Sequence, residues 1–292
     1  MIEPALVSVV TPSLNQAETI AATLASVREQ EHPYLEHIVV DGGSTDRTLE
    51  ILRDARDTVR WTSEPDAGMY DALNKGFASA SGDVLAYLNT DDAWFPWTVA
   101  VAVAALQQHP KVGFVFGDLL IEEPTGELRL DFHSPFRLAY LRRHAFLAQP
   151  TVFVRRSVWD QAGPFDSSLQ LLGDVEYWMR IADRFPGRKV NEVLALQRNH
   201  PAAKRFAQPQ LLAAELDEVR GRYPRPGRPS GALGKIEAGV WRRIFTLAFL
   251  AEQGGWSRFR HEGCVRVSRL RLAATMLPLV GRRFASGAIR RT

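Results

Sequence analysis

The stretch Val84-Leu85-Ala86-Tyr87-Leu88-Asn89-Thr90-Asp91-Asp92 decides the fold. Its first five residues are apolar, which is typical of a strand that is buried on both faces of a parallel sheet. The next four are polar, and two of them carry carboxylates. Ligands of open α/β sheets bind at the carboxyl ends of the strands, so we expect this polar segment to face a binding site.

Short β-branched runs alternate with helical patterns on both sides of that stretch, which is typical of a mostly parallel sheet with crossover helices. Strands are predicted over residues 6–11, 36–40, 59–62, 84–88, 112–117, 151–155 and 188–197. Helices are predicted over residues 20–27, 49–55, 69–80, 97–108, 136–147 and 175–185. Residues 118–130 predict a hairpin with its turn at Pro124-Thr125-Gly126, and Asn15 and Glu18 are spaced as a capping box for the first helix.

Acidic side chains follow three successive strands of this predicted sheet. Asp41 follows the second strand, Glu64 and Asp66 follow the third, and Asp91 and Asp92 follow the fourth. Carboxylates gathered at one edge repel one another unless a cation or the hydroxyls of a ligand satisfy them. One such cluster alone is most simply a solvated turn, but three at neighbouring strand ends favour a ligand site.

The sequence lacks the two common glycine-rich phosphate loops. No Gly-x-Gly-x-x-Gly follows the first strand, and no Gly-x-x-x-x-Gly-Lys occurs in the chain. Dinucleotide-dependent dehydrogenases and P-loop enzymes are therefore disfavoured. A divalent metal on Asp91 is the other means of holding phosphates, because Mg²⁺ and Mn²⁺ bridge carboxylates to substrate phosphates.

Four blocks lie in order near the N-terminus: VSVVTPSLN (7–15), VVDGGSTD (39–46), DAGMYDALNKG (66–76) and GDVLAYLNTDD (82–92). In this combination they resemble glycosyltransferase family 2. Weaker matches follow at QPTVFVRR (149–156), GPFD (163–166) and GDVEYWMR (173–180). The resemblance covers about residues 5–205.

The resemblance implies a GT-A fold, an α/β fold in which a Rossmann-like mixed sheet of the nucleotide-diphospho-sugar transferase type is flanked by helices. It also implies an inverting, hexosyltransferase-type enzyme that uses a nucleotide sugar, with a UDP-sugar as the first donor to consider. Donor-binding roles then fall on Thr11, Pro12, Asn15, Asp41, Asp66, Lys75, Asn89 and Asp92. The metal, Mn²⁺ or Mg²⁺, would be held by Asp91 and His200.

The polar segment departs from the family pattern at one position. The first residue of the usual Asp-x-Asp motif is Asn89 in this chain. An amide can hydrogen-bond a ribose or sugar hydroxyl, but it brings no negative charge. Asp91 must then supply most of the charge to a metal, and we expect lower metal affinity rather than loss of activity.

Asp174 matches the aspartate of the family's Glu-Asp pair, and the resemblance implies that it is the general base. Gly173 stands where that pair has its acidic partner. Without the resemblance, Asp174 is more simply a carboxylate that interacts with the dipole at the start of a helix. Glu176 lies two residues later, does not share a helical face with Asp174, and is the weaker candidate.

Four further positions have two interpretations each. His200 and Lys204 would approach the metal or the diphosphate, or they are ordinary residues of a surface loop. Trp94 and Trp178 lie beside acidic motifs and would stack on a sugar, although aromatic residues are more often part of the core.

Charge divides the chain into two parts. Residues 1–220 hold 21 Lys/Arg and 30 Asp/Glu, whereas residues 221–292 hold 15 Lys/Arg and three Asp/Glu. A Pro- and Gly-rich segment begins at about residue 223. These features predict a GT-A catalytic domain over residues 1–222 and a basic helical C-terminal extension over residues 223–292.

The extension is predicted to contain helices over residues 235–253 and 258–280. Residues 235–292 would bind the anionic surface of the cytoplasmic membrane, or pack on the acidic domain or on a second copy in a homo-oligomer. Binding of nucleic acid is the third interpretation and the least favoured, so no nucleic-acid partner is expected.

We expect a cytoplasmic protein, with the inner face of the cytoplasmic membrane as a peripheral binding surface. The single cysteine, Cys264, excludes a disulfide within the chain. Residues 1–4 lack the basic and apolar regions of a signal peptide. The apolar runs at residues 99–106, 244–251 and 272–280 are shorter than the roughly 18–20 residues of a spanning helix.

The predicted function is transfer of a sugar to the hydroxyl of a saccharide or lipid-linked saccharide, in the synthesis of cell-surface polysaccharide or glycolipid. Two other classes remain. A sugar-phosphate nucleotidyltransferase needs a Gly- and Arg-rich loop after the first strand, where this chain has Ser13-Leu14-Asn15-Gln16. A non-catalytic nucleotide-sugar binding protein with a decayed site is favoured by Asn89 and Gly173.

Overall fold

The computed structural model describes residues 5–131, 133, 135–144, 147–200 and 207–223. The helices predicted over residues 235–253 and 258–280, together with Lys204 and Cys264, lie outside the described residues. The division of the chain into two domains near residue 222 therefore stays a prediction.

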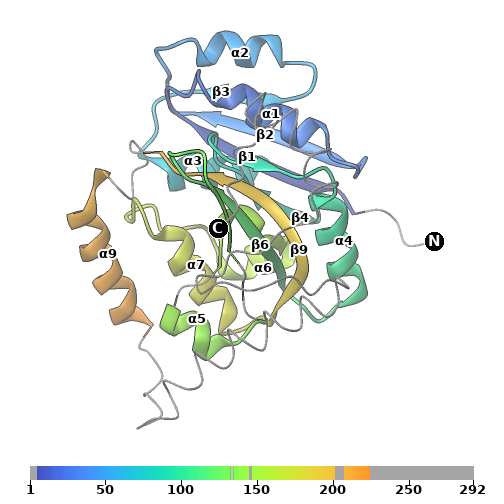
Figure 1. The fold of residues 1–292 in the computed structure, drawn as a ribbon, viewed down its shortest axis with the longest axis vertical. Helices are drawn as coiled ribbons and strands as arrows, with labels where there is room; N and C mark the ends of the chain where they lie inside the picture. Colours follow the sequence, from blue (N-terminus) through green and yellow to red (C-terminus); the bar gives the residue numbers. More distant parts are fainter. Residues whose placement is uncertain (1–4, 132, 134, 145–146, 201–206, 224–292) are drawn as a thin grey trace.

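Nine strands among the described residues form one mixed sheet. The strands are β1 (Val7–Ser13), β2 (Leu35–Asp41), β3 (Arg60–Ser63), β4 (Val84–Tyr87), β5 (Ala93–Trp94), β6 (Phe114–Glu122), β7 (Leu128–Asp131), β8 (Phe153–Arg155) and β9 (Gly187–Arg198). Their order is β3-β2-β1-β4-β8-β6-β9-β5, and β7 pairs with β6 (Figure 1).

Helices cover both faces of this sheet (Figure 1). They are α1 (Ile20–Arg28), α2 (Thr48–Asp54), α3 (Met69–Ser79), α4 (Thr98–Gln108), α5 (Leu138–His144), α6 (Arg156–Ala162), α7 (Gly173–Ala182) and α9 (Pro209–Arg222), with a 3₁₀ turn η1 (Gln149–Thr151). No helix among these has both the length and the apolar character needed to cross a membrane.

The first four strands in the sheet order are parallel, and their carboxyl ends meet at one edge. The register pairs Ser13 with Asp41, and Asp41 with Ser63. On the other side of β1, Val10 pairs with Tyr87 of β4, so the polar segment after β4 begins at the same edge. Parallel pairing alone thus gathers the acidic strand ends that the sequence predicts.

The second half of the sheet is organised by β6, which runs parallel to β9 and antiparallel to β7 and β8. The short strand β5 adds to β9 in antiparallel direction, with Ala93 opposite Leu196. Because β5 directly follows Asp92, this pairing carries the end of the polar segment toward the end of β9. Two segments about 100 residues apart in the chain therefore become neighbours.

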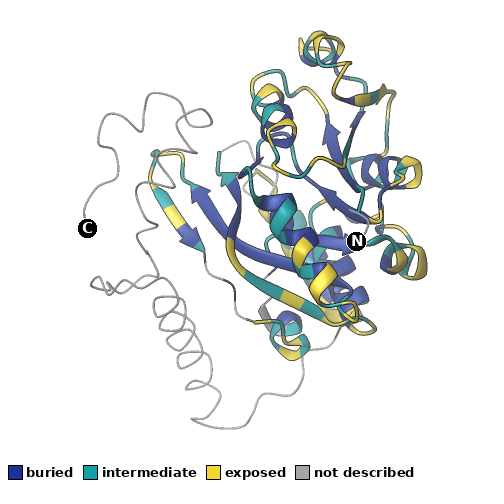
Figure 2. Ribbon diagram, turned by 90° about the vertical axis from the view of Figure 1, so that its right-hand side faces the viewer, coloured by how far each residue is buried: buried dark blue, intermediate teal, exposed yellow. Residues whose placement is uncertain are grey.

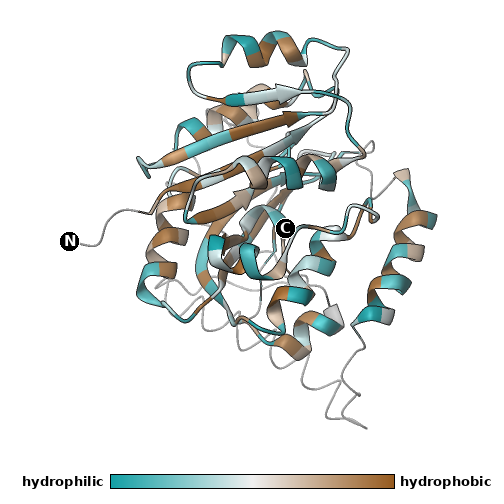
Figure 3. Ribbon diagram, turned by 180° about the vertical axis from the view of Figure 1, so that it is seen from behind, coloured by the Kyte–Doolittle hydropathy of each residue, from teal (hydrophilic) through white to brown (hydrophobic). Residues whose placement is uncertain are grey.

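Strand side chains alternate between two apolar layers. Val10 and Tyr87 belong to the layer that includes residues of α3, α5, α6 and α7. Val9 and Ala86, one residue away on the same strands, belong to the layer with α4 and the end of α1. In Figure 2 the central strands β1, β4 and β6 are largely buried, whereas β3 and the first half of β9 are exposed or half-buried. Apolar residues gather along the strands in Figure 3, while the helices turn hydrophilic faces outward.

Most predicted elements are confirmed within a few residues, including the hairpin turn around Gly126, which has a φ of 79°. The strand predicted to end at Gly117 instead continues to Glu122, with register shifts on either side of Asp118. The short elements β5 and α6, and the 14-residue helix α9, were not predicted from the sequence. The capping box is wrong: Thr19 is the N-cap of α1, and the Asn15 side chain accepts from the Thr45 N–H, 2.8 Å away.

Candidate functional site

A cleft of about 320 Å³ opens at the carboxyl-end edge of the sheet. Its walls come from the ends of β1, β4 and β9, the start of α3 and the turn before α7. The lining residues are Pro12, Ser13, Leu14, Gln16, Asp66, Gly68, Met69, Ala72, Asn89, Thr90, Asp91, Asp92, Gln170, Leu171, Gln197, Arg198 and His200. This volume lies within the range of small-molecule sites, about 300–1,000 Å³.

Two cleft-lining residues have a buried polar atom with no hydrogen-bond partner, namely Ser13 Oγ and Asn89 Oδ1. The Asn89 amide is oriented by Gln149, because Nδ2 donates to Gln149 Oε1 over 3.2 Å. Gln149 is fixed in turn, since its Nε2 donates to the Tyr87 carbonyl over 2.7 Å. Buried polar groups are normally paired, so these two atoms indicate a ligand that supplies the missing partners.

Hydrogen bonds from α1 hold the backbone of the polar segment 89–92. The Thr23 hydroxyl of α1 contacts the carbonyls of Thr90 and Asp92, at 2.9 and 2.7 Å. Thr23 is fully buried and Asp92 is 2% exposed. The backbone of the segment is thereby held in place, with the Asp91 side chain left partly exposed at the cleft.

Asp91 and His200 meet at the cleft, with Oδ2 of Asp91 3.0 Å from Nε2 of His200. Arg198 joins them, because its Nη1 donates to the Asp91 carbonyl over 3.2 Å while its Nε lies 3.4 Å from Glu122 Oε2. The contact places His200 beside Asp91, and the predicted role of the pair as metal ligands stays a prediction. A carboxylate, an imidazole and a guanidinium thus line one wall of the cleft.

These groups fit a divalent cation that a ligand completes. Asp91 offers a hard carboxylate oxygen, His200 an imidazole nitrogen, and Asn89 an amide oxygen without a partner. No group of three or more His, Cys, Asp or Glu residues suited to a metal occurs in the described part of the chain. Where Mg²⁺ also binds substrate phosphates, proteins usually contribute only one or two carboxylates.

Pro12, Asp66, Asn89 and Asp92 line the cleft as the sequence predicts. The Asp66 carboxylate lies so close to Gly42 that a Cβ there would be 2.7 Å from Asp66 Oδ2. Glycine at position 42 is therefore what lets this carboxylate approach the end of β2.

Four predicted donor-binding side chains are not brought to the cleft. Thr11 is fully buried, with its hydroxyl 2.9 Å from His37 Nε2, and Asn15 ties its own loop to the loop after β2. Lys75 pairs with Glu64 over 2.9 Å and is absent from the lining residues. Burial or a local partner engages each of these side chains, and their donor-binding roles stay predictions.

Asp41, the fourth of these side chains, is fully buried and serves its own loop. One carboxylate oxygen accepts the Ser44 hydroxyl, and the other accepts the N–H groups of Gly43 and Ser44 and the Ser63 hydroxyl. It shapes the backbone beside the cleft and does not line the cleft itself.

Asp174 lies in the first turn of α7, next to the cleft wall formed by Gln170 and Leu171 but not itself among the lining residues. Its Oδ1 accepts the Tyr70 hydroxyl over 3.2 Å and the Val175 N–H over 2.8 Å. Burial raises the pKa of Asp174 to about 6, although both hydrogen bonds oppose the rise.

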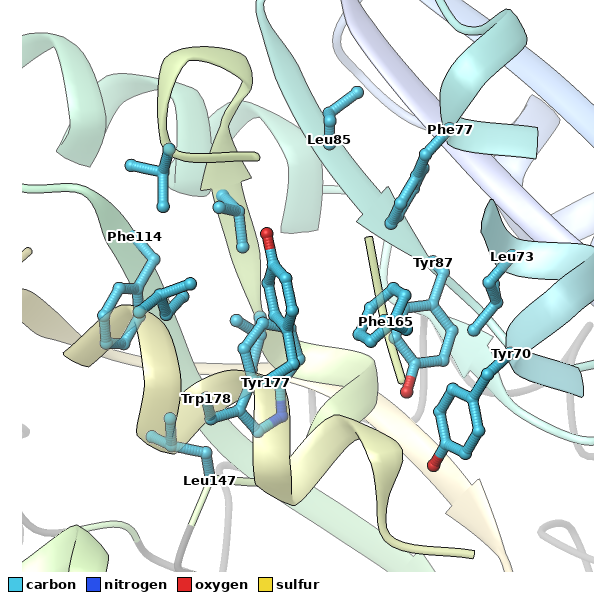
Figure 4. Packing of buried hydrophobic residues seen from close by; sticks show 14 of the residues in the cluster. Tyr70, Leu73, Phe77, Leu85, Tyr87, Phe114, Leu147, Phe165, Tyr177 and Trp178 are labelled. Carbon is cyan, nitrogen blue, oxygen red and sulfur yellow. The ribbon is translucent and has the colours of Figure 1, made fainter. Parts of the chain in front are cut away.

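The ring of Tyr70 reaches Asp174 only because residue 173 is glycine. A Cβ on Gly173 would lie 2.7 Å from the Tyr70 ring. Figure 4 shows Tyr70 of α3 and Tyr87 of β4 in the core that α7 covers. Glu176 is engaged elsewhere: it pairs with Arg180 over 3.0 Å and accepts the Tyr223 hydroxyl over 2.8 Å.

Both tryptophans that were candidates for sugar stacking belong to the core. Trp94 is 1% exposed, and its Nε1 donates to the Pro150 carbonyl over 2.7 Å. Trp178 is 3% exposed and packs edge-on against Tyr177 (Figure 4). Neither ring offers a face to the cleft, so the stacking interpretation is wrong.

Sequence reasoning missed three residues that the cleft uses. Ser13 and Arg198 line it, and Gln149 orients Asn89. Ser13 ends β1, two residues beyond the strand predicted over residues 6–11, and a position at a strand's carboxyl end is a signal by itself. Gln149 begins a motif that the resemblance covers and Arg198 lies within the covered range, but only their contacts with the carbonyls of Tyr87 and Asp91 reveal their role.

The curled mixed sheet, its two helical layers and the cleft at the strand ends define a GT-A type α/β protein. A family model described as "Glycosyl transferase family 2" matches residues 8–158. The chain therefore belongs to glycosyltransferase family 2 and is a glycosyltransferase.

Curated relatives agree with this assignment. The chain is 35% identical over 180 residues to an uncharacterised glycosyltransferase of Mycobacterium tuberculosis (strain ATCC 25618 / H37Rv), covering 60% of this chain and 68% of that protein. It is 30% identical over 182 residues to a PGL/p-HBAD biosynthesis glycosyltransferase of Mycobacterium bovis (strain BCG / Pasteur 1173P2), covering 59% and 68%. It is 30% identical over 199 residues to the TuaG glycosyltransferase of Bacillus subtilis (strain 168), whose name refers to teichuronic acid biosynthesis, covering 65% and 77%.

Solved structures share the fold. S. aureus TarS 1–349 in complex with UDP-GlcNAc has a TM-score of 0.59 at 17% identity, covering 87% of this chain and 94% of that chain. The mannosyltransferase PcManGT from Pyrobaculum calidifontis in complex with GDP-Man and Mn²⁺ has a TM-score of 0.59 at 21% identity, covering 96% and 81%. At these identities the likeness concerns the fold alone.

Proposed function

We propose that the chain is an inverting glycosyltransferase that moves a sugar from a nucleotide sugar to an acceptor hydroxyl at this cleft. One observation carries the proposal: Asp91, His200, Ser13 Oγ and Asn89 Oδ1 converge on one cleft, the last two without partners. A nucleotide diphosphate with its cation supplies what such a site lacks, namely hydroxyl donors, phosphate oxygens and positive charge.

The donor lies with its diphosphate toward Asp91, His200 and Arg198, and its sugar toward Asn89 and Asp92. A divalent cation bound there, Mn²⁺ or Mg²⁺, supplies charge that stabilises the leaving diphosphate. Arg198 adds a positive charge beside the same residue, since its Nη1 already donates to the backbone carbonyl of Asp91. The contribution of Asn89 is a neutral hydrogen-bond acceptor for a hydroxyl.

Asp174 takes the proton from the acceptor. The acceptor oxygen forms a bond to the anomeric carbon while the bond from that carbon to the diphosphate oxygen breaks. The acceptor proton passes to the Asp174 carboxylate, and the nucleoside diphosphate leaves. A pKa of about 6 suits this role, because the carboxylate is ionised at neutral pH and is more basic than an ordinary aspartate.

A UDP-sugar is the donor that we propose first, and a GDP-sugar is the main rival, since TarS is described with UDP-GlcNAc and PcManGT with GDP-Man. The acceptor is a saccharide or lipid-linked saccharide in polysaccharide or glycolipid synthesis, in keeping with the names of the curated relatives. The basic residues 235–292 would hold the protein to an anionic membrane where such acceptors are found.

The test uses purified full-length protein with Mn²⁺ and a panel of UDP-, GDP- and dTDP-sugars, reading melting temperature and donor hydrolysis. Asp91→Asn should weaken nucleotide binding by about 10-fold or more, since it removes the main charged ligand. Asp174→Asn should keep nucleotide affinity and lose about 100-fold or more of turnover. Asp217→Asn, on the exposed face of α9, is the matched control.

Each outcome decides one part of the proposal. Turnover that survives in Asp174→Asn removes the base assignment. If no nucleotide sugar raises the melting temperature, the donor assignment fails. Binding by the wild-type protein without any turnover would favour the non-catalytic class instead.

A further inference from the structure

Glu215 of α9 holds the turn that forms one wall of the cleft. Its Oε1 accepts the Gln170 N–H over 2.6 Å, and its Oε2 accepts the N–H groups of Leu171 and Leu172, each over 2.9 Å. The two segments are more than 40 residues apart in the chain, and α9 lies beside α7 in Figure 1. Glu215 is 5% exposed, so these three donors are what compensates the burial of its charge.

The turn that Glu215 holds connects the cleft to the proposed base. Gln170 and Leu171 line the cleft, and Leu172 is the N-cap of α7, two residues before Asp174. Leu172 has no side chain that can cap the helix, and its N–H bonds to Glu215 instead. A carboxylate at this end of α7 also interacts favourably with the helix dipole.

Docking of α9 does not by itself require this carboxylate. Val219 of the same helix is fully buried in the core, and Arg222 pairs with Asp166 over 2.6 Å. The Tyr223 hydroxyl, just after α9, donates to Glu176 of α7. The hydrogen bonds from three backbone N–H groups to buried Glu215 are therefore not needed merely to dock α9, which indicates a separate role for this carboxylate.

We propose that Glu215 is a positioning residue for sugar transfer: it fixes the 170–172 turn and thereby sets where Asp174 stands relative to the cleft. This inference rests on the proposed function for the role of Asp174. It makes α9, the last described helix before the basic C-terminal residues, part of the machinery that orients the acceptor side of the site.

The experiment compares Glu215→Gln and Glu215→Ala with two controls, Val219→Ala and Asp217→Asn, in the full chain. Val219→Ala removes buried apolar contact from α9 and leaves the carboxylate in place. The donor is the nucleotide sugar that the wild-type protein hydrolyses fastest with Mn²⁺. Both Glu215 variants should lower kcat by about 10- to 100-fold and leave the dissociation constant for the free nucleoside diphosphate within about 3-fold, because only the base side is displaced.

A second readout separates positioning from simple destabilisation. The groups that face Asp174 are Tyr70 of α3, Tyr87 of β4 and Glu215 of α9, and the charge of Glu215 raises the pKa of Asp174. Glu215→Gln should therefore move the acidic limb of the kcat–pH profile to lower pH. Val219→Ala should lower the melting temperature but keep kcat and that limb near wild-type values.

Two results would overturn the inference. The first is a kcat of Glu215→Gln that stays within 2-fold of wild type. The second is a Val219→Ala variant that loses as much kcat as Glu215→Gln when both lose the same melting temperature. If the wild-type protein turns over no donor, the proposed function fails. Hydrogen exchange then tests separately whether Glu215 fixes the 170–172 turn. Amides 170–172 should then exchange at least about 10-fold faster in Glu215→Gln than in Val219→Ala. Equal protection of these amides in the two variants would refute the claim that Glu215 fixes the turn.

Discussion

Replacing Asp174 by asparagine should make the protein more stable at neutral pH while it abolishes turnover. Burial raises the pKa of Asp174 from its ordinary value of 3.8 to about 6. Between these two values the native carboxyl holds a proton that the unfolded chain has released, so the free energy of unfolding falls as pH rises. Above about pH 6 the buried carboxylate lowers the free energy of unfolding by its full amount, and below about pH 3.8 it does not lower it.

The size of the effect follows from the two pKa values. They differ by about 2, and each pKa unit corresponds to about 1.4 kcal/mol, which gives about 3 kcal/mol as an upper limit. Asparagine keeps an oxygen for the Val175 N–H and the Tyr70 hydroxyl but remains a buried polar group, so we expect about 1–2 kcal/mol. That corresponds to a rise of about 3–6 °C in melting temperature for a domain of this size.

Urea unfolding of wild type and Asp174→Asn at pH 7.5 and at pH 4.0 measures this directly. The variant should be more stable at pH 7.5, and the two proteins should be nearly equal at pH 4.0. Asp166→Asn is the control of opposite sign, because hydrogen bonds from Ser168 and Arg222 lower the pKa of Asp166 to about 2. That control should lose about 1 kcal/mol at pH 7.5. An Asp174→Asn variant that is less stable at pH 7.5, or whose effect does not change with pH, would refute the reasoning.

Three further predictions follow from contacts of the site. Tyr70→Phe removes a hydrogen bond that lowers the pKa of Asp174, so the acidic limb of kcat should move to higher pH, and a pH–rate profile with an unmoved limb would contradict this. His200→Ala removes the partner of Asp91, so half-maximal activity should need about 10-fold more Mn²⁺ in a metal titration; an unchanged requirement would exclude His200 as a ligand. Gly173→Ala places a Cβ 2.7 Å from the Tyr70 ring and should cost about 1–3 kcal/mol in urea unfolding, whereas wild-type stability would show that the ring can move aside.

The strand ends of the fold are predictable from the sequence because a short run of neighbouring residues determines each strand and the point where it ends. The short apolar run 84–88 is typical of a buried strand, and the polar residues after such a strand are expected at the edge of the sheet. The same reasoning, applied to the other strands, places Pro12, Asp66 and Asp91 at one edge of the sheet. All three line the cleft.

Other parts of the site depend on pairings that no local pattern reveals. The contact between Asp91 and His200 needs β5 to pair with β9 across about 100 residues of chain. Which way a side chain turns is equally non-local: Thr11 lies near the end of β1 and Asn15 in the loop that follows, yet their partners are His37 and Thr45. Helix α9 has little amphipathic pattern, and its role emerges only from the three N–H groups that Glu215 accepts.

The stereochemistry of the first turnover tests the central claim most directly. Without an acceptor, water takes its place, and proton NMR at early times reads the anomer of the released sugar before it equilibrates. A single displacement assisted by Asp174 predicts that an α-linked donor such as UDP-GlcNAc or another α-linked nucleotide sugar releases the β-anomer first. Release of the α-anomer first would contradict the account, because a single in-line displacement of the diphosphate inverts the configuration at the anomeric carbon.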